Sequence, residues 1–323
     1  MIYFFIFVAS LLLTYLIRTY ALKKSLLAVV NERSSHSVPT PHGGGIAIAL
    51  TWFSGLIYLF TCNEIAPPLF YGLICGTLLS FVSYLDDVYE LAPKLRLIVQ
   101  ALVSGLGLYA LSGISLINLG FYTITNQFIT NGFAFIGIMW FINLYNFLDG
   151  IDGYAGSEAV FLGLAGWFLF GGEYFLILIA SVGGFLVWNW HRAKIFMGDV
   201  GSTLLGYNVA IFALYTQNNG TSILVWLILF GLFWFDATLT LFRRYKNGEK
   251  LSMAHKKHAY QRLTQSGWSH EKVVVYSICL NMLLLILGYI AFSFQNFGIL
   301  FFVIAVVILY GVIIWIDMKK RFE

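Results

Sequence analysis

The feature that most limits how this chain can fold is a series of apolar runs, each about 16 to 22 residues long, separated by short polar gaps. Each run can cross a hydrocarbon layer about 30 Å thick as a helix, which satisfies its own backbone polar groups. Hydrophobic residues make up 59% of the chain and charged residues 11%, whereas a soluble domain carries about 25% charge. We therefore expect an all-α polytopic membrane protein.

The runs predict about eleven transmembrane helices in a single helical domain covering residues 1–323. Their expected limits are 1–20, 43–61, 66–85, 95–112, 131–148, 156–171, 174–190, 201–216, 221–242, 272–292 and 296–316. The first run lacks the basic start and the small-residue cleavage site of a signal peptide. We expect it to be retained as the first span.

The basic residues indicate how the spans are oriented. With the N-terminus outside, all 19 Lys and Arg and all six His fall on one side of the membrane, and the outer loops keep only Glu64 and Glu173. The positive-inside rule then predicts a periplasmic N-terminus, a cytoplasmic C-terminus and an active site at the cytoplasmic membrane face. The predicted cytoplasmic loops lie near 21–42, 86–94, 149–155, 191–200 and 243–271.

Acidic and amide side chains gather at three places that this topology brings to one membrane face. They are Asp86 and Asp87, then Asn143, Asn146, Asp149 and Asp152 at three-residue spacing, and Asp199. Asp199 lies in a Gly-rich turn before a predicted helix, whose free N–H groups favour an anion. Adjacent carboxylates repel unless a cation or a shared proton relieves them, and oxygen ligands beside a phosphate favour magnesium. Ordinary interfacial charges would explain one aspartate pair, but three groups on one face favour a site.

Two further features remain open to both functional and structural interpretations. Asp236 lies inside the span 221–242, where a carboxylate is costly, and we expect Arg243 or Arg244 to be its partner. The stretch 243–271 is either an ordered lid or short helix, or a solvated basic loop that only sets topology.

Two basic segments complement the acids. Arg33, His36 and His42 precede three glycines whose backbone admits a phosphate closely. His255 and His258 are three residues apart and share a helix face. Their neighbouring positive charges favour contact with a diphosphate, and a satisfied histidine pair without a catalytic role is the alternative.

Four motifs, SYLDDVYEL, NLYNFLDGIDGYAG, IFMGDVGS and HKKHAYQR, occur in this order between about Asn31 and Arg262. Together they resemble the polyprenyl-phosphate N-acetylhexosamine-1-phosphate transferases. The resemblance implies transfer of a sugar-1-phosphate from a UDP-sugar to a polyprenyl phosphate, with release of UMP. It also implies Mg²⁺ as the cofactor, with Mn²⁺ as an alternative ion.

The resemblance assigns roles to the matching residues. Asp86 and Asp87 resemble the catalytic and lipid-phosphate-facing acids. Asp199 resembles a catalytic acid that binds the metal, with Asp86 as the second expected ligand. From the motifs and the clusters above, the expected substrate-binding set is Asn143, Asn146, Asp149, Asp152, Asn189, Phe196, Arg33, His36, His255, His258 and Arg262. Within it, Phe196 resembles the ring that stacks on uracil, and the two last histidines resemble the motif that engages the diphosphate.

The departures from the family indicate a branch. Consecutive histidines, typical of the peptidoglycan-precursor enzymes, are replaced by H-x-x-H-x-Y-Q-R, and an eleventh span is expected. This is similar to the branch that starts O-antigen and related surface polysaccharides, and most similar to its enzymes for 6-deoxy-N-acetylhexosamines. The implied partners are a UDP-N-acetylhexosamine, undecaprenyl phosphate and membrane lipid, with no nucleic acid, in the bacterial inner (plasma) membrane. Assembly as a homodimer is left open.

Rival interpretations are also defined. Within the same chemistry, the alternative is a phospho-N-acetylmuramoyl-pentapeptide transferase of peptidoglycan synthesis. In another class, it is an ion-coupled membrane transporter, which requires ionisable groups near the bilayer midplane and access from both sides. A non-catalytic membrane scaffold needs no paired aspartates. Because the charges crowd one face, we favour the enzyme.

Overall fold

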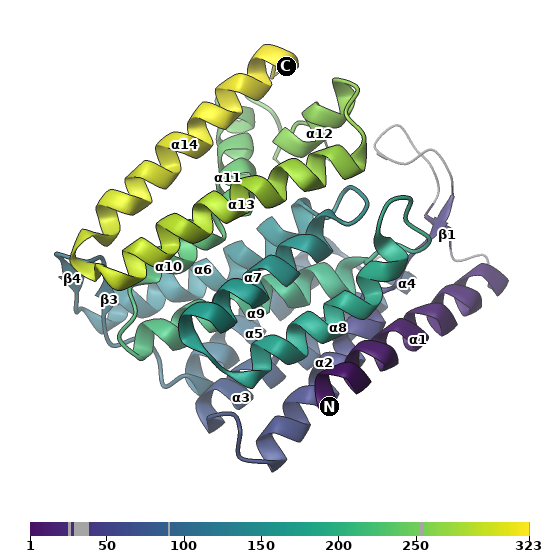
Figure 1. Ribbon diagram of the computed structural model, residues 1–323, viewed down its shortest axis with the longest axis horizontal. Coiled ribbons are helices and arrows are strands. Elements are labelled where there is room, and N and C mark those ends of the chain that lie inside the picture. The colour runs from purple at the N-terminus through teal and green to yellow at the C-terminus, as the bar shows by residue number, and fades with distance from the viewer. Residues whose placement is uncertain (25–26, 29–38, 90, 252, 254, 323) are drawn as a thin grey trace.

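The computed structural model describes residues 1–24, 27–28, 39–89, 91–251, 253 and 255–322 of the 323-residue chain. These residues form a bundle of helices with two small antiparallel hairpins (Figure 1). The helices are α1 (Ile2–Lys23), α2 (Gly45–Thr61), α3 (Pro67–Ile74), α4 (Gly76–Tyr89), α5 (Pro93–Ala110), α6 (Gln127–Phe147), α7 (Tyr154–Phe170), α8 (Glu173–Asn189), α9 (Asp199–Asn218), α10 (Ile223–Leu229), α11 (Gly231–Lys246), α12 (Ala259–Gln265), α13 (His270–Ser293) and α14 (Gly298–Lys319). The strands pair as β1 (Leu27–Ala28) with β2 (Thr40–Pro41) and β3 (Ile117–Asn118) with β4 (Thr123–Ile124), and the 3-10 turn η1 (Gln295–Phe297) precedes α14.

The helices follow the apolar runs of the sequence. α3 and α4 together occupy the third predicted span, and α10 and α11 occupy the ninth. In the described part of the chain, α1, α3–α4, α6, α13 and η1–α14 are long and apolar enough to cross a membrane. The pair α10–α11, bent by 81°, is a sixth candidate, and α2, α7 and α8 are shorter apolar helices. The prediction of an all-α polytopic membrane protein is confirmed, whereas eleven crossings and their orientation stay predictions.

Local signals explain where the helices beside the site begin. Pro93 opens α5 at a position where its missing N–H costs nothing. The Ser269 hydroxyl accepts a hydrogen bond from the Lys272 amide at the start of α13 (3.2 Å). At the start of α12, the His258 amide donates to the Gln261 side chain (3.2 Å). The short helix predicted for the stretch 243–271 is therefore confirmed as α12.

α9 runs through the middle of the bundle, among α2, α4 and α6. Every residue from Val200 to Leu214 is buried. A Cβ atom on Gly206 would lie 2.5 Å from the Phe141 carbonyl oxygen, so a glycine is needed for α6 to approach this closely. Small residues commonly bring membrane helices together in this way. The tight packing fixes the N-terminus of α9, where Asp199 lies.

The prediction that Arg243 or Arg244 is the partner of Asp236 was wrong. Both carboxylate oxygens of Asp236 accept the Ala259 amide at 2.9 Å, at the start of α12, and Thr240 donates a further hydrogen bond (3.1 Å). Arg243 and Arg244 pair with Asp317 (2.9 Å) and Glu249 (3.0 Å). Asp236 instead caps the free N–H groups at the N-terminus of α12.

Candidate active site

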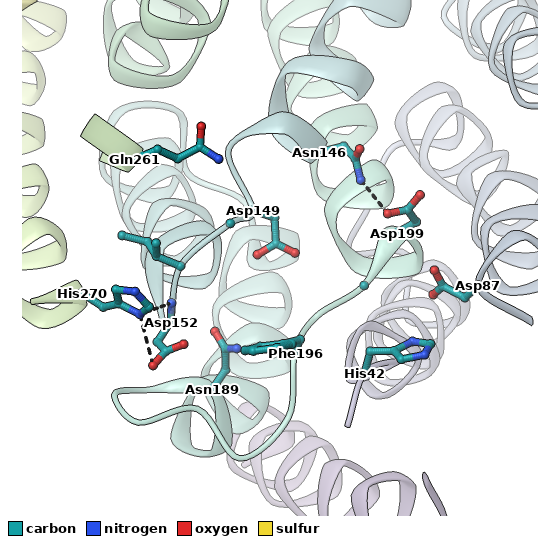
Figure 2. A pocket seen from close by; sticks show the side chains of 13 residues that line it. His42, Asp87, Asn146, Asp149, Asp152, Asn189, Phe196, Asp199, Gln261 and His270 are labelled. Carbon is teal, nitrogen blue, oxygen red and sulfur yellow. Dashed lines mark hydrogen bonds and ion pairs between the residues drawn. The ribbon is translucent and has the colours of Figure 1, made fainter. Parts of the chain in front are cut away.

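A cavity of about 380 Å³ lies at the end of the bundle that carries α12 (Figure 2). Loops and helix ends that are far apart in sequence surround it. Its lining residues are His42, Asp87, Asn146, Asp149, Gly150, Ile151, Asp152, Asn189, Phe196, Gly198, Asp199, Gln261 and His270. The end of α4 and the start of α9 each supply one carboxylate, and the α6–α7 loop supplies two. The predicted convergence of the three acidic segments is therefore found in the structure.

A close contact between two glycine-rich segments builds one side of the cavity. Residues 41–45 pair with residues 196–197 through three backbone hydrogen bonds of 2.8 to 2.9 Å. A Cβ atom on Gly45 would lie 2.3 Å from the Gly201 amide nitrogen, so a larger residue does not fit. The contact brings His42 beside the start of α9 (Figure 2). Burial lowers the pKa of His42, although the Asp199 charge opposes this effect.

Asp199 is held at the N-terminus of α9. Gly198, at φ +76°, makes the turn into the helix. The Asn146 amide group donates to Asp199 Oδ1 and to the Ser202 hydroxyl, both at 2.9 Å. Arg96 Nη1 lies 3.8 Å from the other oxygen, Oδ2. The side chain is thus oriented by an amide and a nearby cation, with the helix dipole favouring its negative charge.

The neighbouring carboxylates Asp86 and Asp87 differ in their surroundings. Asp86 is buried outside the cavity, where it accepts the Leu91 amide (2.8 Å) and the Arg96 guanidinium (3.0 Å). Asp87 lines the cavity, and its buried Oδ2 has no hydrogen-bond partner among the described residues. Adjacent residues of a helix point about 100° apart, which accounts for the difference.

Asp149 follows the last turn of α6 and faces Asp87 and Asp199 across the cavity (Figure 2). Burial and the negative charges of Asp199 and Asp87 raise the pKa of the Asp149 carboxyl to about 7. Without a cation, the three carboxylates therefore cannot all ionise freely near neutral pH.

Asp152 is surrounded by hydrogen-bond donors. Its Oδ2 lies 3.2 Å from His191 Nδ1, 3.3 Å from His270 Nδ1 and 3.1 Å from the Ala193 amide nitrogen. Burial alone would raise the pKa of Asp152, but these contacts outweigh it and lower the pKa. Asp152 is therefore a charged carboxylate, and its other oxygen has no hydrogen-bond partner in the described part of the chain.

Two groups of residues have the composition of a cation site. Asp87 and Asp199 offer carboxylate oxygens, which Mg²⁺ prefers, and the unpartnered Asp87 Oδ2 fits such a ligand. Asp152, His191 and His270 have ligand atoms within 4.8 Å of one another. Because the Ala193 amide and two imidazole nitrogens already lie 3.1 to 3.3 Å from Asp152 Oδ2, we interpret the second group as a hydrogen-bonded cluster. The residues of the first group fit the expected metal, but the expected second ligand, Asp86, lies outside the cavity on the Leu91 amide and Arg96, and Asp87 lines the cavity in its place.

One of the expected substrate-binding residues on α6 does not line this cavity. Asn143 exchanges hydrogen bonds with Gln100 (2.8 and 3.4 Å) and lies in a separate apolar groove. Arg33 and His36 lie outside the described residues. Asn146, Asp149, Asp152, Asn189 and Phe196 do line it.

The expected basic residues near α12 lie behind the cavity wall. His258 is buried, with Nδ1 3.9 Å from Asp236 Oδ1. Burial and the nearby charges of His258 and Arg244 lower the pKa of His255 to about 4. Arg262 pairs with Asp317 on α14. In this arrangement none of the three side chains reaches the cavity.

Comparison with known proteins identifies the family. Residues 69–217 match the model of glycosyl transferase family 4, a segment that includes Asp87, Asp149, Asp152 and Asp199. A probable undecaprenyl-phosphate N-acetylglucosaminyl 1-phosphate transferase of Bacillus subtilis (strain 168) is 30% identical over 284 residues, which cover 82% of this chain and 77% of that protein. This chain belongs to glycosyl transferase family 4.

Other relatives agree with this assignment. An undecaprenyl-phosphate alpha-N-acetylglucosaminyl 1-phosphate transferase of Yersinia pestis is 30% identical over 307 residues, covering 88% of this chain and 82% of the relative. One from Salmonella typhi is 27% identical over 293 residues, covering 84% and 77%. The resemblance that the motifs indicated is confirmed.

The structure adds functional candidates that the motifs left without a role. His270 and Gln261 line the cavity, and His191 contacts Asp152. All three lie at span ends or loops on the predicted cytoplasmic face. This is the only sequence signal for His191 and His270, whereas Gln261 also lies in the HKKHAYQR motif. Their contact with the α6–α7 loop depends on tertiary packing.

Proposed function

We propose that this protein transfers N-acetylhexosamine-1-phosphate from a UDP-sugar to undecaprenyl phosphate and releases UMP. The observation that carries the proposal is the group of aspartates, Asp87, Asp149, Asp152 and Asp199, around one cavity in a membrane-protein bundle. The relatives' names specify the acceptor and the transferred N-acetylglucosaminyl 1-phosphate group. An ion-coupled transporter has no need of carboxylates gathered at one end of the bundle.

The reaction is a displacement at phosphorus. An oxygen of the lipid phosphate attacks the β-phosphorus of the UDP-sugar and forms a new P–O bond. The bond from this phosphorus to the bridging oxygen breaks, and UMP leaves with the electron pair. The second pKa of a phosphate monoester is about 6, so the attacking phosphate is already ionised near neutral pH and no protein base is needed.

Asp87 and Asp199 are the proposed metal ligands, with Asn146 orienting Asp199. When bound, Mg²⁺ or Mn²⁺ would neutralise charge on the phosphates as a Lewis acid. Asp86 has a supporting part, because it holds Arg96 near Asp199. These groups bring two anionic substrates together, and their positioning supplies much of the rate.

The donor occupies the cavity in this proposal. The half-buried Phe196 ring lines the cavity and offers a face for uracil, beside Asn189 and Asp152 (Figure 2). Asn189 accepts the Gly153 amide at 3.0 Å and donates to the Ile195 carbonyl at 3.0 Å. It therefore ties the α6–α7 loop to the segment that carries Phe196, and so fixes the width of the nucleoside site.

The acceptor's hydrocarbon chain has its own groove. An apolar groove of about 620 Å³ lies between α5, α6 and α11, lined by side chains that include Leu97, Trp140, Asn143 and Phe242. Asn143 is one turn from Asn146 on α6, so the groove continues toward the cavity. We assign the polyprenyl chain to this groove, which leaves its phosphate next to Asp87 and Asp199.

The cellular setting is proposed with the same reaction. Eleven crossings, a periplasmic N-terminus and a site on the cytoplasmic face of the bacterial inner membrane would give access to cytoplasmic UDP-sugars and to the lipid. We propose a role in starting O-antigen or a related surface polysaccharide, with a 6-deoxy-N-acetylhexosamine as the first donor to test.

The test is UMP release by purified protein in detergent, with undecaprenyl phosphate, Mg²⁺ and a panel of UDP-N-acetylhexosamines. Release that requires both lipid and metal supports the proposal and names the donor. Release only with the muramoyl-pentapeptide donor would move the chain to peptidoglycan synthesis. No release with any donor, from folded protein, contradicts the enzyme assignment.

A further inference from the structure

The last turn of α14 and the residues after it lie against α12, the helix that forms one wall of the cavity (Figure 1). We propose that this C-terminal segment clamps α12 in place, with Asp317 as a positioning residue that acts on the donor site through Arg262. The inference rests on the proposed function, since it assigns a role in donor binding.

α12 depends on outside contacts for its position. It is only seven residues long, and a helix of this length is not stable alone. At its start Asp236 accepts the Ala259 amide (2.9 Å), and the Tyr260 hydroxyl donates to the Phe147 carbonyl (3.2 Å). These contacts hold the first two residues of α12. Near its end Leu263 is buried in the core and Gln265 donates to the Lys256 carbonyl (2.7 Å). Arg262, between them, needs an anchor of its own.

Asp317 provides this anchor. Its carboxylate pairs with Arg262, which is only 3% exposed, and with Arg243 of α11 at 2.9 Å. Arg262 Nη1 also donates to the Lys320 carbonyl (3.2 Å). One carboxylate on α14 thus joins α11 and α12. Removing a partner would leave the buried guanidinium of Arg262 without its counter-charge, which is strongly unfavourable.

Phe322 strengthens the same contact. Its ring lies 5.3 Å from the Arg243 guanidinium, 5.4 Å from that of Arg262 and 5.6 Å from the Lys257 ammonium group. Cations within about 6 Å of an aromatic ring are attracted to its face. The aromatic side chain therefore sits against the positive charges that Asp317 pairs.

The clamp reaches the cavity through adjacent residues of α12. Arg262 faces α14, while its neighbour Gln261 lines the cavity. A Cβ atom on Gly150 would lie 2.0 Å from the Tyr260 hydroxyl oxygen, so α12 also packs closely on the α6–α7 loop. A shift of α12 therefore changes the wall beside Asp149 and Asp152. Donor binding is the step that we expect to respond.

The first experiment compares Asp317→Asn with the wild-type enzyme, and Arg321→Ala, an exposed position on the same segment, is the matched control. We expect the KM for the UDP-sugar to rise about tenfold, with the KM for undecaprenyl phosphate unchanged and the control normal. In a Gln261→Ala background the same substitution should add little, because coupled residues are not additive. Asp317→Glu should restore part of the donor affinity.

A second readout does not depend on turnover. Amide hydrogen exchange in residues 259–265 should become faster in Asp317→Asn and in Phe322→Ala, while exchange in α9 stays slow. Unchanged exchange and an unchanged donor KM overturn the clamp. A fall in melting temperature with equal rises in both KM values makes Asp317 a general stability residue and also overturns it. If the wild-type protein makes no product, the proposed function fails, and the exchange data still decide the clamp.

Discussion

His270 Nδ1 lies 3.3 Å from Asp152 Oδ2 and also 3.3 Å from the Asp152 amide nitrogen. Nδ1 donates to the carboxylate when it carries a proton and accepts from the amide when it does not, so in either form the first residue of α13 contacts Asp152 in the α6–α7 loop. His191 and the Ala193 amide approach the same oxygen from the α8–α9 loop. Three segments thus fix one carboxylate, and its second oxygen is left available to the proposed donor.

Replacing His270 should weaken donor binding more than catalysis. His270→Ala leaves the buried Asp152 with one partner fewer, at a cost of about 1–3 kcal/mol in stability. Because the carboxylate is then less firmly held, we expect the KM for the donor to rise. His270→Asn should restore much of the affinity, since its amide nitrogen can replace Nδ1. Steady-state kinetics with varied UDP-sugar measures the effect. A fall in kcat with an unchanged donor KM would refute this role.

Asp199→Asn should greatly reduce metal-dependent turnover. Loss of this charge removes a proposed ligand and leaves Asn146 with a weaker acceptor, and we expect kcat to fall by about 10²- to 10³-fold. Glu64→Gln makes the same chemical change at an exposed residue, and it should have normal activity. Insertion is checked by the amount of monodisperse protein recovered in detergent. Normal turnover of Asp199→Asn would remove this residue from the metal role.

Asp149 should make the protein less stable as the pH rises. Its folded pKa of about 7 lies above the unfolded value of 3.8, so between about pH 4 and 7 the folded protein keeps a proton that the unfolded chain releases. Stability is therefore lost with rising pH, by on the order of 4 kcal/mol at pH 8.

The check for this titration is thermal unfolding of Asp149→Asn in detergent with EDTA. The variant should gain more in melting temperature, relative to wild type, at pH 8 than at pH 5. Glu64→Gln serves as the charge-matched control and should gain equally little at both. An identical gain for Asp149→Asn at the two pH values would contradict the raised pKa.

Gly45→Ala should damage both stability and activity. The added Cβ would lie 2.3 Å from the Gly201 amide nitrogen, and relieving that overlap would push α2 away from α9 at a cost of about 1–3 kcal/mol. The displaced segment carries His42. Gly105→Ala has open space around its Cβ and should be neutral or slightly stabilising. Melting temperature and UMP release measure both variants, and a normal Gly45→Ala enzyme would mean that the contact is not needed.

The sequence predicted the helices and the meeting of the acidic segments, for a simple reason. Continuous apolar runs define membrane helices, and the positions of Lys and Arg give the membrane face on which each loop lies. Asp87, Asp149, Asp152 and Asp199 could therefore be assigned to one depth without any knowledge of packing.

The sequence could not predict two kinds of feature. One is the rotation of a helix about its own axis, and the other is contact between residues that are far apart in the chain. Asp86 and Asp87 are adjacent in the sequence, which gives no sign of which one faces the site. Only the orientation of α4 directs Asp87 into the cavity. Asp236 finds its partner at Ala259, beyond a loop whose path no periodicity defines. The contact of His270 with Asp152 joins residues that are 118 positions apart.

The central claim is that a sugar-1-phosphate, and not the sugar alone, is transferred. It is tested most directly with a UDP-N-acetylhexosamine labelled with ³²P at the β-phosphorus, incubated with the protein, undecaprenyl phosphate and Mg²⁺. The account predicts that the label enters the lipid fraction in proportion to unlabelled UMP formed, and that Asp199→Asn forms both products about 10²- to 10³-fold more slowly. Label found in UDP, with sugar but no ³²P in the lipid, would contradict it.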